Sequence, residues 1–328
     1  MRELYAGIFM QEIDLPGNPL KSINNYIVKG DGGDLMIDTA FNRPECIEQL
    51  ESHLLQCAVD PAKLRLFLTH LHADHTGLAG YLTDRGAQVL MGETDLAIVS
   101  DSCIPDHNHW AEIQRNAHAQ GLDEDDVHIE EHPGFRWRPA HPIQATALHE
   151  GDVISVGPYR FEVVDLAGHT PGMQGLYEPV HQLFFCGDHI LGKITPNITY
   201  WNASVGDSLG RYFENLEKVR KLPIRHLFSS HRFLVEDVPA RIDELFHHHE
   251  VRLQEAVACL EKYGPSTVRT VTKNLHWDIR AKNWDDFPKS QKWFAAGEAM
   301  AHLEHLVAIG RVARYTRADG VFEYALVK

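Results

Sequence analysis

The sequence predicts a layered α/β domain followed by a smaller, mainly helical domain. Over residues 1–237, short runs of β-type residues alternate with amphipathic segments, which is the pattern of β-sheets covered by helices. From residue 238 onward the apolar residues take the spacing of long helices, and two short β-type runs close the chain. We therefore expect domains at residues 1–237 and 238–328.

The first elements are a hairpin and a helix. The runs INNYIV (23–28) and DLMIDTA (34–40) flank the turn GDGG, so we expect them to pair as a β-hairpin. Residues 44–55 predict a helix, because Pro and Glu open the segment and its leucines share one face. The run LRLFL (64–68) predicts a buried strand.

The middle of the chain predicts a helix, an insertion and further strands. GLAGYLTDRG predicts a helix that ends at Gly86, and the polar segment 100–140 predicts a helical insertion that covers the site. Further strands are predicted by the runs AQVLMG, DVISV, YRFEVVDL, QGLYEP, QLFFCGD and RHLFSS.

The C-terminal part predicts three helices and a β-hairpin. Residues 239–264 form one long amphipathic stretch, and STVRTVTKNL and residues 290–310 predict two more helices. RVARYT and VFEYAL flank Arg-Ala-Asp-Gly, which predicts the hairpin. Three helices followed by a two-stranded wing is the layout of a winged helix.

Composition excludes several classes of protein. The net charge of −15 opposes nucleic acid as a partner. No apolar run approaches the roughly 20 residues of a membrane span, and no signal peptide is expected at the N-terminus. The five cysteines are scattered without CxxC spacing, which indicates reduced thiols in a cytoplasmic setting.

Polar side chains follow four predicted strands, each at the point where the strand ends. THLHADHTG comes directly after LRLFL, and the segments GHTPG, GDH and SSHR follow later strands. We expect all these side chains on the same edge of the sheet. They are five histidines and two aspartates: His70, His72, Asp74, His75, His169, Asp188 and His231.

Imidazole and carboxylate groups are the ligands that suit zinc and similar divalent metals. His70 and His72 lie two positions apart in an extended turn, so both rings can point to one ion. Asp74 and His75 then reach a second ion beside it. Seven ligands exceed what one four- or five-coordinate ion uses, so a two-metal site follows if Asp188 bridges the ions.

These motifs make the chain similar to the metallo-β-lactamase superfamily. The matching segments are THLHADH, GHTPG, GDH, the terminal SSH and MIDTA near the start, and the resemblance covers residues 1–236. It implies an αββα four-layer sandwich with the site along one edge. It also implies one ion on His70, His72 and His169, a second on Asp74, His75 and His231, and Asp188 as the bridge.

The resemblance has further implications and two departures. Asp38 matches a family aspartate that supports the metal-binding loops without binding metal. The family often continues GHTPGH, whereas Met173 follows the glycine here, and the last histidine lies in the context Ser-Ser-His231-Arg232. The C-terminal run QKWFAAGEAMAHLEHLVAIGRVARY resembles the winged-helix tail of lactamase-like hydrolases, including the mitochondrial lactamase-like endoribonuclease, and differs from the all-helical tail of glyoxalase II.

The function expected from these residues is hydrolysis at two divalent ions, zinc in the first place and Mn²⁺ or Fe²⁺ as alternatives. A hydroxide bridging the ions would attack a small thioester or ester, and Asp74 would orient it or relay its proton. An endoribonuclease or phosphodiesterase could use the same site. An iron-dependent oxidoreductase of the superfamily is the other enzymatic alternative, and a non-catalytic module is opposed by the intact ligands.

Residues beside the ligand segments are candidates for substrate contact. Lys193, Tyr200 and Arg232 follow ligand segments and could meet an anionic small-molecule substrate. Three tryptophans are expected as core or interface anchors: Trp277, Trp284 and Trp293.

The helix at residues 290–310 predicts how the C-terminal domain packs. Phe294, Met300, Leu303 and Leu306 share an apolar face. We expect the opposite face to present Glu298, His302, Glu304 and His305, which is not the basic face of a DNA reader. The domain is therefore expected to pack on the first domain, or on a second subunit in a homo-oligomer.

Overall fold

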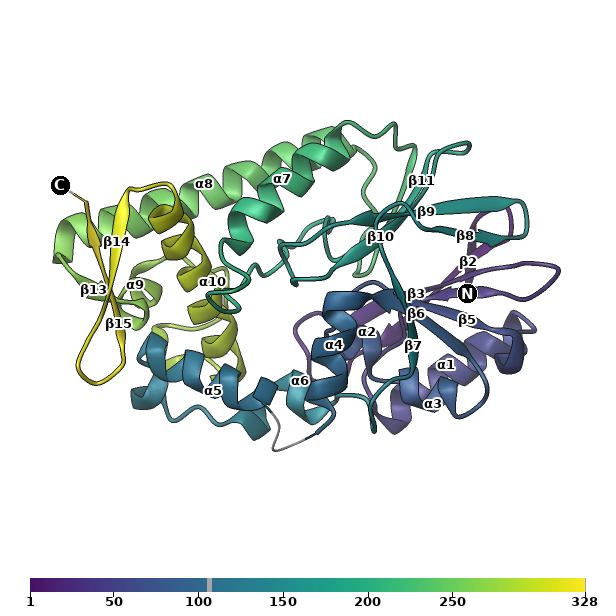
Figure 1. Cartoon of the computed structure of the whole chain (residues 1–328), viewed down its shortest axis with the longest axis horizontal. Helices are drawn as coiled ribbons and strands as arrows, with labels where there is room; N and C mark the ends of the chain where they lie inside the picture. Colours follow the sequence, from purple (N-terminus) through teal and green to yellow (C-terminus); the bar gives the residue numbers. More distant parts are fainter. Residues whose placement is uncertain (105–107, 328) are drawn as a thin grey trace.

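Two β-sheets lie face to face at the centre of the first domain (Figure 1). A computed structural model of the chain describes residues 1–104 and 108–327. The larger sheet has the strand order β1-β2-β3-β4-β5-β6-β7, and the smaller has the order β12-β11-β10-β9-β8. Strands β4 to β7 are parallel to one another, as are β11 and β12, and the remaining neighbours are antiparallel.

The strand bounds are these: β1 (Arg2–Tyr5), β2 (Ile8–Asp14), β3 (Ser22–Val28), β4 (Leu35–Ile37), β5 (Arg65–Leu68), β6 (Gln88–Gly92), β7 (Ala145–Leu148), β8 (Val153–Val156), β9 (Tyr159–Asp165), β10 (Gln174–Glu178), β11 (Leu183–Gly187) and β12 (His226–Ser229).

Alternating side chains divide each sheet between two hydrophobic cores. In β5, Leu66 and Leu68 pack with α1 (Pro44–Gln56) and α3 (Ala79–Thr83), whereas Phe67 lies between the sheets. In β11, Phe185 also lies between the sheets, whereas Phe184 packs with α7 (Ser208–Arg220) and α8 (Val238–Tyr263). The four layers confirm the predicted αββα sandwich.

Several elements differ from the prediction. The helix expected over residues 77–86 is only the short α3, and Gly86 lies at φ +97° in the turn that follows. Another short helix, α2 (Ala73–Thr76), precedes α3 within the ligand segment. The strands β1, β2 and β7 and the helix α7 were not predicted. In α7 the signal is present in the sequence, because Leu209, Tyr212 and Leu216 share one buried face and Asp207 accepts a hydrogen bond from Gly210 N at 2.8 Å as its N-cap.

The predicted insertion is a run of short helices against the C-terminal domain. Asp125, which is buried, accepts from Arg269 Nε at 2.7 Å, from Lys292 Nζ at 3.0 Å and from Trp284 Nε1 at 2.7 Å. These bonds fix the insertion to the C-terminal domain. Its helices are α5 (Asn108–Gln120), η2 (Leu122–Asp125), η3 (Ile129–Glu131) and α6 (Pro133–Arg136). Helix α4 (Glu93–Ser102) leads into the insertion, and η1 (Pro61–Lys63) precedes β5.

The C-terminal domain consists of helices and a small sheet of the order β13-β15-β14. The predicted hairpin is β14 (Val312–Thr316) and β15 (Phe322–Leu326), and β13 (Ser266–Thr267) adds a third strand. After α8 the helices are α9 (Val268–Asn274), η4 (Trp284–Asp286) and α10 (Lys289–Ala308). The winged-helix assignment stays a prediction. None of the described helices meets the length and hydropathy of a bilayer-spanning segment.

Helix α10 is buried more completely than its sequence predicts. Glu298 and His302, expected on an exposed polar face, are 6% and 0% exposed. The expectation is wrong because α10 contacts α5 and α7 of the first domain as well as α8 and α9. His305 Nδ1 lies 2.9 Å from Asp207 Oδ2 across this boundary. These contacts confirm that the C-terminal domain packs on the first domain.

Candidate metal centre

The predicted polar side chains come together at one end of the stacked sheets. The segment from His70 to His75 follows β5 of the larger sheet. His169 lies between β9 and β10, Asp188 follows β11 and His231 follows β12, all in the smaller sheet. The prediction that one sheet edge carries all of them is therefore wrong, since loops from both sheets meet there.

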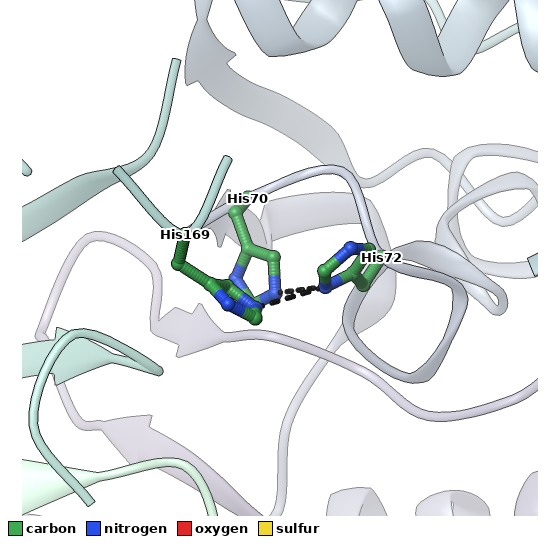
Figure 2. A group of neighbouring side chains, drawn as sticks. All are labelled: His70, His72 and His169. Atoms are coloured by element: carbon green, nitrogen blue, oxygen red, sulfur yellow. Dashed lines mark hydrogen bonds between the residues drawn. The ribbon is translucent and has the colours of Figure 1, made fainter. Parts of the chain in front are cut away.

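Three histidines form the first group. His70 Nε2 lies 3.1 Å from His72 Nδ1, and His169 Nε2 lies 3.0 Å from the same nitrogen. Figure 2 shows the three rings, two from the loop after β5 and one from the loop between β9 and β10, directed to one point. Nitrogens bound tetrahedrally to one zinc at about 2.0–2.1 Å lie about 3.3 Å apart. The group therefore has nearly the spacing that a shared ion requires.

The second group contains Asp74, His75 and His231. His231 Nε2 lies 3.4 Å from Asp74 Oδ2, and His75 Nε2 lies 3.9 Å from the same oxygen. The ligand atoms all lie within 4.8 Å of one another, and all three residues are buried. One carboxylate and two imidazoles are a suitable donor set for a divalent ion.

Asp188 lies between the two groups. Its Oδ1 is 3.4 Å from His231 Nε2 and 3.6 Å from His75 Nε2, both of the second group. Its Oδ2 is 3.7 Å from His169 Nε2 of the first group. The two oxygens of one carboxylate thus face different groups, which is the arrangement that a bridging ligand requires.

The electrostatics of the groups favour bound cations. Burial lowers the pKa of His70 and of His72 well below the usual value, so both imidazoles are neutral and keep a lone pair for a metal. Burial also lowers the pKa of His231, but Asp188 and Asp74 outweigh this and raise it to about 10. These carboxylates attract positive charge, which divalent ions supply in place of protons.

Unpaired polar atoms provide an independent test of whether ions fit. His75 Nε2, His231 Nε2 and Asp188 Oδ1 are buried and have no hydrogen-bond partner in the part of the chain that the structure describes. Buried polar atoms without partners are rare in native proteins. One ion at the second group satisfies all three, and the first group has the spacing for another, so the residues present fit two divalent ions.

The outer ring nitrogens of the histidines are held by acceptors. His169 Nδ1 donates to Asn197 O and His231 Nδ1 to Ser22 O, each at 2.7 Å. His75 Nδ1 lies 2.8 Å from Asp38 Oδ2. These bonds direct Nε2 of each ring toward the centre, as in known metal sites.

Asp38 connects the loop after β4 to the loop after β5. Its carboxylate accepts from Thr69 N at 2.8 Å and from Thr69 Oγ1 at 2.8 Å, besides its contact with His75. Asp38 adopts a φ of 59°, which aspartate tolerates better than most residues. The contacts agree with the supporting role that the resemblance implies.

Asp95 is a supporting residue that the sequence analysis missed. Its fully buried carboxylate accepts from Leu71 N at 3.0 Å, Thr170 Oγ1 at 2.5 Å and Gly172 N at 2.6 Å. It therefore ties the loop of His70 and His72 to that of His169. Burial raises its pKa to about 6 in spite of these hydrogen bonds. An acid in the first turn of α4 is common, so the sequence carries no specific signal for it.

A cavity of about 860 Å³ opens at the centre and extends to the C-terminal domain. Lys193, Tyr200 and Arg232 all line it. The Arg232 guanidinium donates to Leu20 O at 3.0 Å and to Pro19 O, and Lys193 Nζ lies 4.4 Å from the ring of Phe233. Their contact with substrate stays a prediction.

Sequence models of two families match the chain. The model described as metallo-beta-lactamase superfamily matches residues 19–231, and the model described as metallo-beta-lactamase-like, C-terminal domain, matches residues 285–327. The lactamase-like protein nscB of Arthroderma benhamiae is 25% identical over 252 residues, which are 76% of this chain and 45% of that protein. The nscB protein of Aspergillus fumigatus is 24% identical over the same share of this chain and 60% of its own length. The chain thus spans about half of these relatives.

Solved structures agree with the sequence matches. A metallo-beta-lactamase family protein from Thermus thermophilus superimposes with a TM-score of 0.84 at 26% identity, over 99% of this chain and 100% of that one. A beta-lactamase domain protein from Burkholderia ambifaria gives a TM-score of 0.80 at 25% identity, over 99% and 94%. The chain belongs to the metallo-beta-lactamase superfamily.

Proposed function

We propose that the protein is a hydrolase of small esters or thioesters that uses two divalent ions, preferentially zinc. The observation that supports this most directly is the position of Asp188, whose two oxygens face two separate groups of ligand atoms. A bridging carboxylate is required only where two ions lie side by side.

The chain's own residues account for the proton transfer. Burial raises the pKa of Asp74, but His75 and His231 outweigh burial and lower it to about 2. Asp74 is therefore a carboxylate at neutral pH and lines the cavity, where it can accept a proton from a water nucleophile. Bound divalent ions would supply acidification of that water and stabilisation of negative charge on the carbonyl oxygen.

Hydrolysis then requires a second proton transfer, to the leaving group. The water oxygen forms a bond to the carbonyl carbon, and the bond to the leaving alcohol or thiol breaks. The proton held by Asp74 passes to the leaving oxygen or sulfur, which regenerates the carboxylate. Buried Asp38 and Asp95 hold the loops around these atoms, so the geometry is fixed before substrate arrives.

The cavity favours a small molecule over RNA. Its volume of about 860 Å³ is that of a ligand pocket. Its walls include Trp110 of the insertion and Phe294 of α10. The chain carries a net charge of −15, which opposes binding of a polyphosphate.

The test is a substrate panel on purified protein with its metals quantified. We expect turnover of esters or thioesters at near two zinc ions per chain, loss on chelation and recovery when zinc is restored. His72→Ala should abolish turnover, whereas His149→Ala, which changes an exposed histidine, should not. Turnover of RNA or phosphodiesters alone, or redox activity on iron without hydrolysis, would overturn the proposal.

A further inference from the structure

Arg252 is a buried cation in the wall of the cavity. It lies on α8 and is 7% exposed. Its Nη1 is buried without a hydrogen-bond partner among residues 1–104 and 108–327. A guanidinium withdrawn from water without hydrogen bonds is costly, so such a group indicates a missing partner. Trp293 Nε1, a second buried donor without a described partner, lines the same cavity.

The surroundings of Arg252 hold its guanidinium in place without using all its donors. Its carbon Cζ lies 4.1 Å from the centre of the Trp277 ring, a cation–π contact. Its Nε lies 3.7 Å from Glu298 Oε1, which is an ion pair but too long for a hydrogen bond. Burial raises the pKa of Glu298, but His248 and Arg252 outweigh this and lower it, so Glu298 is a carboxylate.

A short chain of contacts connects Arg252 to the metal centre. His169 Nδ1 donates to Asn197 O at 2.7 Å, and Asn197 Nδ2 donates to Glu298 Oε2 at 2.9 Å. Glu298 then pairs with Arg252. All four residues line the one cavity. A substrate placed at the metal centre can therefore extend past Asn197 to the guanidinium.

We propose that Arg252 binds a carboxylate at the end of the substrate remote from the bond that is cleaved. A guanidinium has the planar fork that matches carboxylate oxygens. Glu298 already neutralises part of the charge, so a monoanion fits better than a doubly charged phosphate. This inference rests on the proposed function and narrows its substrates to esters and thioesters that carry a terminal acid.

The test uses matched esters that differ only at the far end. The p-nitrophenyl monoesters of succinic, adipic and suberic acids carry a terminal carboxylate, and their controls carry a terminal primary amide. Turnover of any amide-ended ester tests the proposed function, whereas the ratio of kcat/KM between the acid and the amide tests the subsite. The two proposals can therefore fail separately.

Arg252→Gln should lower that ratio about ten- to a hundredfold, because a charge-assisted hydrogen bond to a buried group is lost. The substitution should raise KM for the acid-ended esters and leave kcat largely unchanged. Arg225→Gln is the control, since Arg225 is exposed before β12, at the end of the strand opposite the metal centre. An unchanged ratio in Arg252→Gln, or an equal fall in Arg225→Gln, would overturn the subsite.

A binding measurement needs no turnover. Calorimetry should show that the metal-loaded protein binds the monoamide of suberic acid more tightly than the diamide, and that Arg252→Gln removes the difference. If Arg252→Gln does not fold, Arg252→Lys serves instead and should lose part of the preference, because lysine keeps the charge but lacks the fork. A stronger preference for a phosphate-ended ester would overturn the assignment to a carboxylate.

Discussion

Replacing Asp38 by asparagine should remove the ion of the second group while leaving the fold intact. The side chain is 1% exposed and holds Thr69 N with one oxygen and His75 Nδ1 with the other, each at 2.8 Å. Asparagine has the same shape and tolerates the φ of 59°. The Thr69 N–H fixes the amide oxygen of the new side chain on its own side, so the amide NH₂ would face His75.

The substitution Asp38→Asn changes the tautomer of the His75 ring. An NH₂ group facing Nδ1 requires Nδ1 to be an acceptor, and the ring proton then moves to Nε2, the atom that would bind metal. Restoring the original tautomer against this contact costs about 1.5–3 kcal/mol, the worth of a hydrogen bond to a charged group. At about 1.4 kcal/mol per tenfold, the affinity for the second ion should fall about 10- to 150-fold.

The assay is a zinc titration against a chromophoric chelator, with the bound metal counted after dialysis. Asp38→Asn should retain one tightly bound ion, on His70, His72 and His169. The control is Asp34→Asn at the other end of β4, where Asp34 pairs with Lys29 at 2.6 Å. That variant should bind both ions normally. Two ions bound by Asp38→Asn with unchanged affinity would refute the reasoning about the tautomer.

Three further predictions follow from the structure. Asp188→Ala should deplete both ions and His169→Ala only one, because only Asp188 faces both groups; metal analysis that finds equal losses would contradict the bridge. Burial lowers the pKa of His53 to about 4, so its folded form binds fewer protons than the unfolded chain below pH 6.5, and about 3 kcal/mol of stability should be lost between pH 6.5 and 4. Denaturation across this range should give a flatter pH dependence for His53→Leu, and an unchanged slope would count against it. Deleting the chain from Val238 should uncover Leu209 and Tyr212 on α7 and cause aggregation in size-exclusion chromatography, whereas a soluble monomer would show that α7 does not need this cover.

The sequence predicts those parts of the fold whose local pattern agrees with their tertiary surroundings. The run at β5 is apolar because both faces of the strand are buried, and the polar cluster follows where the strand ends. The local pattern of helix α10 predicts its surroundings wrongly, because α10 contacts four other helices and its Glu298 and His302 are buried. Strand β7 has the sequence ATAL, which carries no strong β-type signal, and its place depends on pairing with β6.

The candidate site also contains residues that the sequence predicts and residues that it does not. The ligand residues are visible because their types and spacing are improbable without a metal, and the structure brings all seven together. The sequence carries no specific signal for Asp95 and Arg252, because an acid in the first turn of a helix and an arginine on an amphipathic helix occur in most proteins. Their roles follow from their burial and from partners distant in sequence, such as Thr170 and Glu298.

The 26 residues of α8 form a rod about 39 Å long that begins only seven positions after His231. Under the two proposals, the residues that cleave the bond and the residue that selects the substrate belong to separate stretches of the chain, which α8 and the hydrogen bonds of Asp125 connect. A substitution of Arg252 would therefore change the preferred substrate while the seven ligand residues stay the same.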